Sequence, residues 1–415
     1  MKENHTISNQ SQRKKLGEVC TYSKGKKPAV LNDTKTKHCA VPYINIKAFE
    51  KGIISEYTNG ERCNICNDDD LLMVWDGARC GLIGKAKKGA VGSTLMKILP
   101  TEEIHKEYLY HFISSKFTIL NTKPKGVGIP HIEPTLLWNF ELVVPSIHEQ
   151  ETIVSKIEEL ISKIENGKQQ LETAQQQLKV YRQSLLKAAF EGKLTNKNVK
   201  DGELPEGWKF EELKNICVIK RGKSKHRPRN ESSLFGGKYP FIQTGDIREA
   251  NGGFIKKYSQ TYSELGLQQS KLWPKGTLCI TIAANIGETA ILDFDACFPD
   301  SVVGLLSDEK QLLNKYTNYF FISHKSKLEK LAPATAQKNI NVEILEKVRI
   351  PLSSIDEQQL IVEELESKLT VCDKIEETIT QSLQQAETLR QSILKKAFEG
   401  KLVSVENFVN ETQPA

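Results

Sequence analysis

The chain has 415 residues, of which 39% are apolar and 27% are charged, and its formal net charge is +6. This length is too great for a single hydrophobic core and predicts two or more domains. It contains no apolar run long enough to span a membrane and no apolar secretory leader, and its nine cysteines are an odd number. Membrane and disulfide-bonded secreted classes are therefore not expected, and a cytoplasmic protein with reduced thiols is.

Residues 1–145 are predicted to form a globular domain that mixes short strands with helices. Apolar runs broken by turn residues indicate strands, and a longer segment at residues 104–120 indicates a helix. The runs lie at residues 16–22, 41–46, 71–75, 82–83, 94–99 and 140–144. This pattern is typical of the α+β class.

A long helix with marked ends is predicted over residues 146–195. It follows Pro145 and starts with a capping box formed by Ser146 and Glu149. It ends at Gly192, because glycine tolerates the left-handed backbone that follows a last turn. Apolar residues recur at alternating spacings of four and three, the seam of a two-stranded coiled coil. The seam comprises Ile153, Ile157, Leu160, Ile164, Gly167, Leu171, Ala174, Leu178, Tyr181, Leu185 and Ala188.

Residues 196–207 form a linker of turn composition, and residues 208–350 are predicted to form a second domain on the plan of the first. A helix at residues 312–331 and a last strand at 348–350 close this domain. The parallel segments are 16–25 with 213–222, 41–46 with 239–247, and 70–75 with 275–282. Because the frame is shared while the loops differ, the two domains are expected to recognise two different targets.

A second long helix is predicted over residues 351–403, followed by a flexible tail at 404–415. Residues 390–402 repeat residues 182–194 with about two substitutions in about 13 positions, and the match extends upstream to residues 147 and 355. The second copy carries its own capping box at Ser354 and Glu357. The long period identifies a duplicated module rather than a chance match.

The connectivity predicts how the two long helices pair. Each helix follows a domain, and only a short linker separates the first helix from the second domain. If the helices pack on each other, the second must return toward the first domain, so the two are antiparallel. The fold predicted is therefore α+β, with two similar domains joined by two long antiparallel coiled-coil helices in pseudo-two-fold symmetry.

The positive charge is concentrated in the two domains. Residues 1–144 carry about +6 and residues 208–350 about +7, whereas the two helical segments carry about 0 and −4. Two basic modules on a neutral to acidic frame are typical of a nucleic-acid reader with two points of contact. Lysines that only improve solubility are the alternative reading of the charge.

The candidate DNA contacts are basic and amide side chains in loops that occupy matching places in the two domains. Loops of this kind can place Lys on phosphates, Arg on guanine and Asn or Gln on adenine. In the first domain the candidates are Lys24, Lys26, Lys27, Arg79, Lys85, Lys87 and Lys88. In the second domain they are Arg221, Lys223, Lys225, Arg227, Arg229, Asn285, Gln337 and Lys338. For each residue taken alone, a solvated loop is the competing reading.

No catalytic or metal-binding set is predicted. The chain has no phosphate-binding Gly-x-x-x-x-Gly-Lys-Ser/Thr loop, no Pro-Pro dipeptide and no His-Glu-x-x-His motif. Cys63 and Cys66 have zinc-like spacing, but no second pair follows, so a plain thiol pair on a turn is favoured over structural zinc. Residues 68–70, three consecutive aspartates, are interpreted as a solvated turn.

The duplicated helix ends, with the segment Leu204-Pro-Glu-Gly-Trp208 before the second domain, resemble the specificity (S) subunits of type I restriction–modification systems. The resemblance covers nearly the whole chain. The first domain departs from the pattern, since it lacks the Leu-Pro-x-Gly-Trp segment and begins at residues 10–15 with Gln-Ser-Gln-Arg-Lys-Lys, which leaves the start of that domain open.

The resemblance implies two target-recognition domains, each reading one half of a split, asymmetric site in double-stranded DNA. It also implies that the paired helices set the spacing and dock two modification (methyltransferase) subunits, with restriction (endonuclease) subunits completing the complex. S-adenosylmethionine, Mg and ATP are then expected on those partners and none on this chain. From the residues alone, a coiled-coil scaffold, an RNA-binding protein with two basic modules, or an enzyme with an unrecognised site remain open.

Overall fold

The computed structural model describes residues 12–122, 130–196, 198–283, 285–331 and 340–402. The chain divides into two compact units. Unit 1 contains Met1–Leu171 and Thr380–Ala415, and unit 2 contains Glu172–Ile379. Each unit therefore combines one globular domain with the ends of two different long helices.

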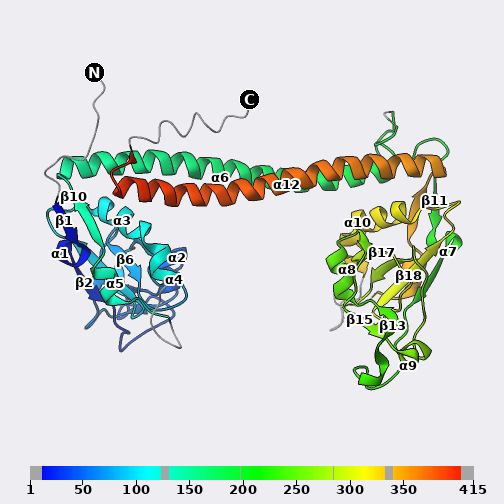
Figure 1. Ribbon diagram of the computed structural model, residues 1–415, viewed down its shortest axis with the longest axis horizontal. Coiled ribbons are helices and arrows are strands. Elements are labelled where there is room, and N and C mark those ends of the chain that lie inside the picture. Colours follow the sequence, from blue (N-terminus) through cyan, green and yellow to red (C-terminus); the bar gives the residue numbers. More distant parts are fainter. Residues whose placement is uncertain (1–11, 123–129, 197, 284, 332–339, 403–415) are drawn as a thin grey trace. The chain divides into compact units, whose positions relative to one another are not determined.

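The first domain is built from short, mostly antiparallel strands covered by helices (Figure 1). Its strands form sheets of order β2-β9-β6-β7, β4-β3-β8-β5 and β1-β10. The elements are β1 (Gln12–Lys15), α1 (Leu16–Val19), β2 (Cys20–Lys24), β3 (Val41–Ile44), α2 (Ile46–Lys51), β4 (Tyr57–Thr58), β5 (Ile65–Cys66), β6 (Leu71–Val74), β7 (Ile83–Lys85), β8 (Gly89–Val91), β9 (Leu95–Pro100), α3 (Lys106–Ser115), α4 (Phe117–Thr122), α5 (Pro134–Trp138) and β10 (Glu141–Val144).

The second domain repeats this plan with a larger main sheet, of order β12-β18-β16-β17-β14, and the pairs β11-β19 and β13-β15. Its elements are β11 (Lys209–Glu212), α7 (Leu213–Ile216), β12 (Cys217–Arg221), η1 (Ser232–Leu234), β13 (Phe235–Phe241), α8 (Thr244–Ala250), β14 (Phe254–Ile255), β15 (Gln260–Tyr262), α9 (Glu264–Gln268), β16 (Leu278–Thr281), β17 (Thr289–Leu292), β18 (Val302–Ser307), α10 (Asn314–Leu331), α11 (Val342–Glu346) and β19 (Arg349–Leu352). The predicted α+β class with two similar domains is confirmed.

Three local predictions need correction. The run at residues 16–22 is not all strand, because Leu16 and Val19, three apart and fully buried, form one face of α1 before β2 begins. Likewise, the segment 239–247 leaves β13 at Phe241 and enters α8. The helix expected at residues 104–120 is two helices, α3 and α4. Apolar spacing in such short runs does not distinguish a strand from a helical turn.

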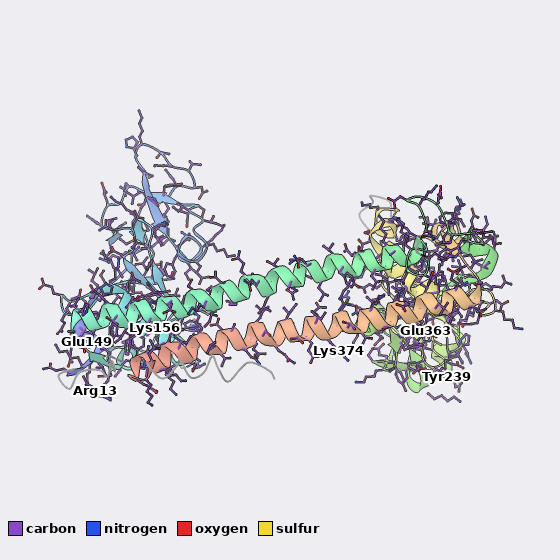
Figure 2. The ribbon with its side chains drawn as sticks, turned by 90° about the horizontal axis from the view of Figure 1, so that it is seen from above. Arg13, Glu149, Lys156, Tyr239, Glu363 and Lys374 are labelled. Carbon is purple, nitrogen blue, oxygen red and sulfur yellow. The ribbon has the colours of Figure 1, made fainter. Side chains whose placement is uncertain are left out.

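The two long helices are α6 (Ile147–Phe190) and α12 (Ile355–Phe398), each 44 residues long. In unit 1 the start of α6 packs on the end of α12, with Ile157 beside Ile393 and Leu394. In unit 2 the end of α6 packs on the start of α12, where Arg182 pairs with Asp373 at 2.5 Å. The helices are therefore antiparallel, as predicted. Charged side chains such as Lys156, Glu363 and Lys374 lie along them (Figure 2).

The helix seam differs from the prediction at one described position. Tyr181 was expected in the seam, but its side chain is 49% exposed. Its neighbour Arg182 is only partly exposed and bonds Asp373 and Glu376 of α12. An ion pair thus replaces an apolar contact at this level of the coiled coil.

The two capping boxes also differ. At the start of α6, the Ser146 backbone N–H donates to Glu149 at 2.9 Å and the Glu149 N–H donates to Ser146 Oγ at 3.3 Å, as predicted. At the start of α12, the Glu357 N–H still donates to Ser354 Oγ. The Glu357 carboxylate, however, accepts from the indole N–H of Trp208 at 2.7 Å. The Leu-Pro-Glu-Gly-Trp segment therefore ties the linker to the second helix.

A buried glutamine joins each long helix to its domain. Gln358 is fully buried, and its Oε1 accepts from the Leu313 N–H at 3.0 Å. Its Nε2 donates to the carbonyls of Gln311 and Ser353, each at 3.0 Å. Gln150 makes the same three bonds in unit 1, with the N–H of His105 and the carbonyls of Glu103 and Pro145. These bonds explain the repeated Glu-Gln pair in the sequence, since a buried amide must be fully hydrogen-bonded.

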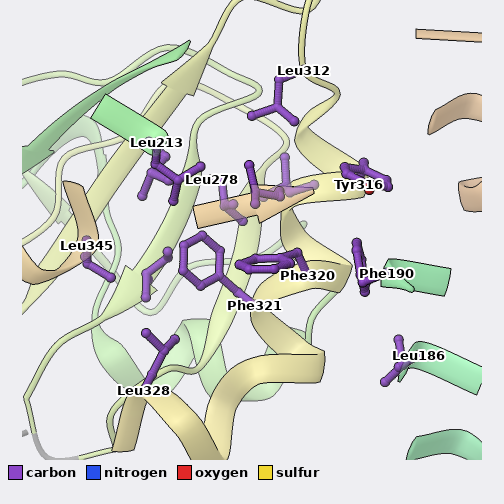
Figure 3. Packing of buried hydrophobic residues seen from close by; sticks show 14 of the residues in the cluster. Leu186, Phe190, Leu213, Leu278, Leu312, Tyr316, Phe320, Phe321, Leu328 and Leu345 are labelled. Atoms are coloured by element: carbon purple, nitrogen blue, oxygen red, sulfur yellow. The ribbon is translucent and has the colours of Figure 1, made fainter. Parts of the chain in front are cut away.

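Each domain also receives an aromatic residue from the end of a long helix. In unit 2, the ring of Phe190 lies edge-on to Tyr316 and Phe320, at centroid distances of 5.0 and 5.4 Å (Figure 3). In unit 1, the ring of Phe398 meets Tyr108 and Phe112 in the same way, at 5.1 and 5.3 Å. The core of each domain is therefore completed by the helix that begins after the other domain.

We expect Phe190→Ala to destabilise unit 2 by about 3–5 kcal/mol, because it removes a buried aromatic ring and leaves a cavity. Thermal and chemical unfolding of the full chain measures the loss. Val180→Ala on the same helix is the control, since its side chain is 66% exposed, and we expect a change within about 0.5 kcal/mol. Equal effects of the two substitutions would show that the helix end does not complete the core.

Candidate nucleic-acid interface

The basic loop of each domain starts at a glycine that crosses close to a neighbouring backbone. In the first domain, Gly25 follows β2 and its N–H donates to the Leu95 carbonyl at 2.9 Å. In the second, Gly222 follows β12 and its N–H donates to the Val302 carbonyl at 2.8 Å. A Cβ at either glycine would collide with backbone carbonyl oxygens. The shared Lys/Arg-Gly-Lys sequence thus marks the same structural position twice.

In the first domain this position brings together a cation, a carboxylate and an indole. Lys24 Nζ lies 2.9 Å from Asp76, at the end of β6, and 6.0 Å from the ring centre of Trp75. Lys26 and Lys27 follow in the loop and are exposed. These two lysines remain candidates for phosphate contacts, whereas Lys24 is already paired.

The remaining candidates of the first domain do not join this group. Lys85 pairs with Leu71 at the start of β6, whereas Lys24 lies two strands away and pairs with Met96 of β9, which faces Met73 of β6. Lys85 Nζ lies 3.0 Å from Glu107 of α3. Partial burial opposes protonation, but the hydrogen bond to Glu107 raises the pKa of Lys85.

Three further candidates of the first domain are placed as follows. Arg79 pairs with Glu50 of α2 at 3.0 Å. Lys87 and Lys88 are exposed beside Asp68, which accepts from the Lys88 backbone N–H at 2.9 Å. Arg79 therefore lies in the turn between β6 and β7, whereas Lys87 and Lys88 lie between β7 and β8.

In the second domain the loop after β12 is held on a neighbouring loop. Arg229 pairs with the Asp300 carboxylate at 2.7 Å, and Arg221 Nε donates to the Asp300 carbonyl. Arg227 donates to backbone carbonyls within its own loop, including that of Ser224 at 2.8 Å. Lys223 and Lys225 are exposed.

The structure adds two lysines that sequence reasoning missed. Lys271 Nζ lies 3.8 Å from the ring centre of Trp273. Burial, and then the positive charges of Lys220 and Lys223, lower the pKa of Lys271. Three cations from two segments therefore lie near one another at the basic loop, a concentration of like charge that favours an anionic ligand. Their separation along the chain, about 50 residues, hid this cluster from motif reading.

Asn285 lies half-buried in the turn between β16 and β17, and its carbonyl accepts from Thr281 Oγ1. Gln337 and Lys338 lie outside the described residues.

Among the residues described, no group of three or more His, Cys, Asp or Glu side chains is placed to hold a metal ion. Cys66 is buried, which raises the pKa of its thiol, and its Sγ donates to the Gly89 carbonyl. No helix in the described part of the chain is both long and apolar enough to cross a membrane.

The two domains and their repeated frame match one protein family. Residues 9–176 and 205–385 match the "Type I restriction modification DNA specificity domain". Because the two matches cover most of the chain, the protein belongs to this family.

Curated relatives agree along almost the full length. The chain is 28% identical over 404 residues to the type I restriction enzyme MjaVIII specificity subunit of Methanocaldococcus jannaschii, covering 94% of this chain and 92% of that protein. It is 27% identical over 384 residues to the EcoBI specificity subunit of Escherichia coli, covering 88% and 80%.

Solved structures show the same fold. A chain from a solved structure that describes the complex assembly and conformational transition of the type I R-M system aligns with a TM-score of 0.75 at 21% identity. The alignment covers 96% of this chain and all of that one. The HsdS subunit from Thermoanaerobacter tengcongensis aligns with a TM-score of 0.60 at 21% identity, covering 97% and 100%.

We expect Lys223→Ala and Lys85→Ala to differ in their effect on DNA binding. Lys223 is free to neutralise a phosphate, so its loss weakens binding to a random-sequence duplex and makes the slope of log affinity against log salt shallower by about 0.9. Lys85 is paired with Glu107, so its loss leaves the slope unchanged. Salt titrations monitored by fluorescence anisotropy test this. A shallower slope for Lys85→Ala alone would reverse the assignment.

Proposed function

We propose that this chain is the DNA-reading subunit of a type I restriction–modification complex, and that its two domains read the two halves of a split, asymmetric site. The observation that carries the proposal is the common frame with unlike loops. Gly25 and Gly222 hold the same backbone position, yet Lys26-Lys27 follow the first, and a loop with two lysines and two further arginines follows the second. Equivalent positions with different side chains can read different bases.

We further propose that the long helices set the distance between the half-sites and dock two modification subunits. A helix of 44 residues rises about 65 Å, which exceeds the roughly 34 Å of one DNA turn. In unit 2 these helices carry exposed apolar side chains, among them Val180 at 66%, Val371 at 55% and Ile375 at 43%. Exposed apolar groups on a charged helix suit a protein partner.

Catalysis belongs, in this proposal, to the partners. The modification subunits supply S-adenosylmethionine and transfer its methyl group to adenine, and the restriction subunits supply the Mg- and ATP-dependent steps. This chain selects the DNA sequence on which the partners act. A coiled-coil scaffold or an RNA-binding protein with two basic modules is the alternative function, favoured only by the same basic loops.

Mapping methylated adenines in the host genome, with and without this gene, tests the function. We expect one bipartite motif with a fixed gap to lose its methylation when the gene is deleted. The reconstituted complex should protect that motif and bind duplex DNA in preference to RNA of equal length. Unchanged methylation, together with a complex that protects no defined site, would favour the scaffold or RNA reading. Methylation by the isolated chain would identify it as an enzyme.

The spacer role predicts a change of gap without a change of bases. Inserting about four residues, roughly one turn or 6 Å, in both α6 and α12 lengthens the pair and unwinds the seam only locally. We expect the methylated motif to keep both half-sites and to gain a longer gap. An unaltered gap in a folded, active variant would argue against the spacer role.

A further inference from the structure

The second domain contains an open cleft of about 550 Å³ beside the basic loop. Its floor is aromatic, since the rings of Phe241 and Tyr262 stack at 4.0 Å and Phe235 lies 5.4 Å from Tyr262. Its rim includes Arg229, Gln243 and Gln260. The cleft therefore offers apolar surface for a thymine methyl or a base edge, with amide and guanidinium groups around it.

Two glutamine side chains on the rim are joined by a hydrogen bond. Gln243 precedes α8, and its Nε2 donates to Oε1 of Gln260 at 2.7 Å. Gln260 is the first residue of β15 and is exposed. Across the described residues, its own Nε2 has no protein partner, and its Oε1 keeps a second lone pair. Gln243 thus orients an amide that still presents one donor and one acceptor, the pair that binds adenine N7 and N6.

The surroundings of the cleft favour DNA as its occupant. Arg229 on the rim is half exposed, although it is paired with Asp300. Lys220 and Lys223 lie close enough to Lys271 for their positive charges to repel its ammonium group. A polyanion relieves this repulsion, and a duplex whose backbone lies on these lysines places base edges toward the rim.

The first domain has a hydrogen-bonded pair of side chains at the positions equivalent to Gln243 and Gln260. Asn45 precedes α2, and its Nδ2 donates to Glu56 Oε2 at 2.6 Å. The strand pairing fixes the equivalence, because Pro42 faces Tyr57 there as Pro240 faces Thr261 in the second domain. The exposed amide of Gln260 is thus matched by the half-buried carboxylate of Glu56. A carboxylate only accepts hydrogen bonds, so it selects the amino group of cytosine.

We propose that Gln260, oriented by Gln243, reads an adenine in one half-site, and that Glu56, oriented by Asn45, reads a cytosine in the other. This inference rests on the proposed function and assigns its base-specific contacts. Each reading side chain is fixed by a second side chain from another element, which is how a protein holds a recognition group in place before binding. Gln243 and Asn45 are positioning residues.

The test exchanges the two chemistries. In the reconstituted methyltransferase complex, binding to a duplex library that varies every base of the site is measured for wild type, Gln260→Glu and Glu56→Gln. We expect Gln260→Glu to lower the preference for adenine at one position of one half-site by about 5- to 150-fold and to favour cytosine there. Glu56→Gln should make the reverse change in the other half-site only. Gln359→Glu, on the exposed surface of α12, adds the same charge as a control and should leave the motif unchanged.

Gln243→Met gives a second readout. It keeps the volume but removes the bond to Gln260, so we expect weaker selectivity at the same position without a new preferred base. Uniform weakening over all sequences, or an unchanged motif in folded variants, would overturn the base-reading assignment while the proposed function stands. A wild-type complex that selects no sequence would instead overturn the proposed function.

Discussion

The structure depends on how each long helix is anchored at its two ends. At its start, a buried glutamine ties the helix to the domain that precedes it, through three hydrogen bonds. At its end, an aromatic ring completes the core of the other domain, as Phe190 does against Tyr316 and Phe320. Since a buried amide and a buried ring are both costly to expose, neither end is free to detach. Because the long helix is duplicated in the chain, both kinds of anchor occur in each unit.

This anchoring separates the parts of the chain that must stay constant from those that can change. The glutamine contacts, the loop glycines and the aromatic contacts recur in both domains with nearly the same distances. The side chains that differ lie at the surface, in the basic loops and in the pairs Asn45–Glu56 and Gln243–Gln260. A protein organised in this way can alter what it reads without altering its fold, because the variable side chains contribute little to the core.

Charge alone was a limited guide to the interface. Lys24, Arg79, Lys85 and Arg229 are each paired with a carboxylate. By contrast, Lys26, Lys27, Lys223 and Lys225 are exposed at the same point of the two domains, and Lys271 joins the second group from a distant segment. Whether a lysine is available to DNA depends on its acidic neighbours, and these come from elements that are remote in sequence.

The sequence by itself determined the domain pattern, the two long helices, the capping of α6 and the position of both basic loops. These follow from local signals, namely apolar period, capping residues, glycine and an internal repeat. Only the tertiary structure decided that the Glu357 carboxylate bonds Trp208 instead of closing a capping box, that Lys85 and Lys24 lie on opposite sides of β6 in the sheet, and that Gln260 and Glu56 occupy equivalent positions. Each of these depends on contacts between residues far apart in the chain, and no local pattern encodes such contacts.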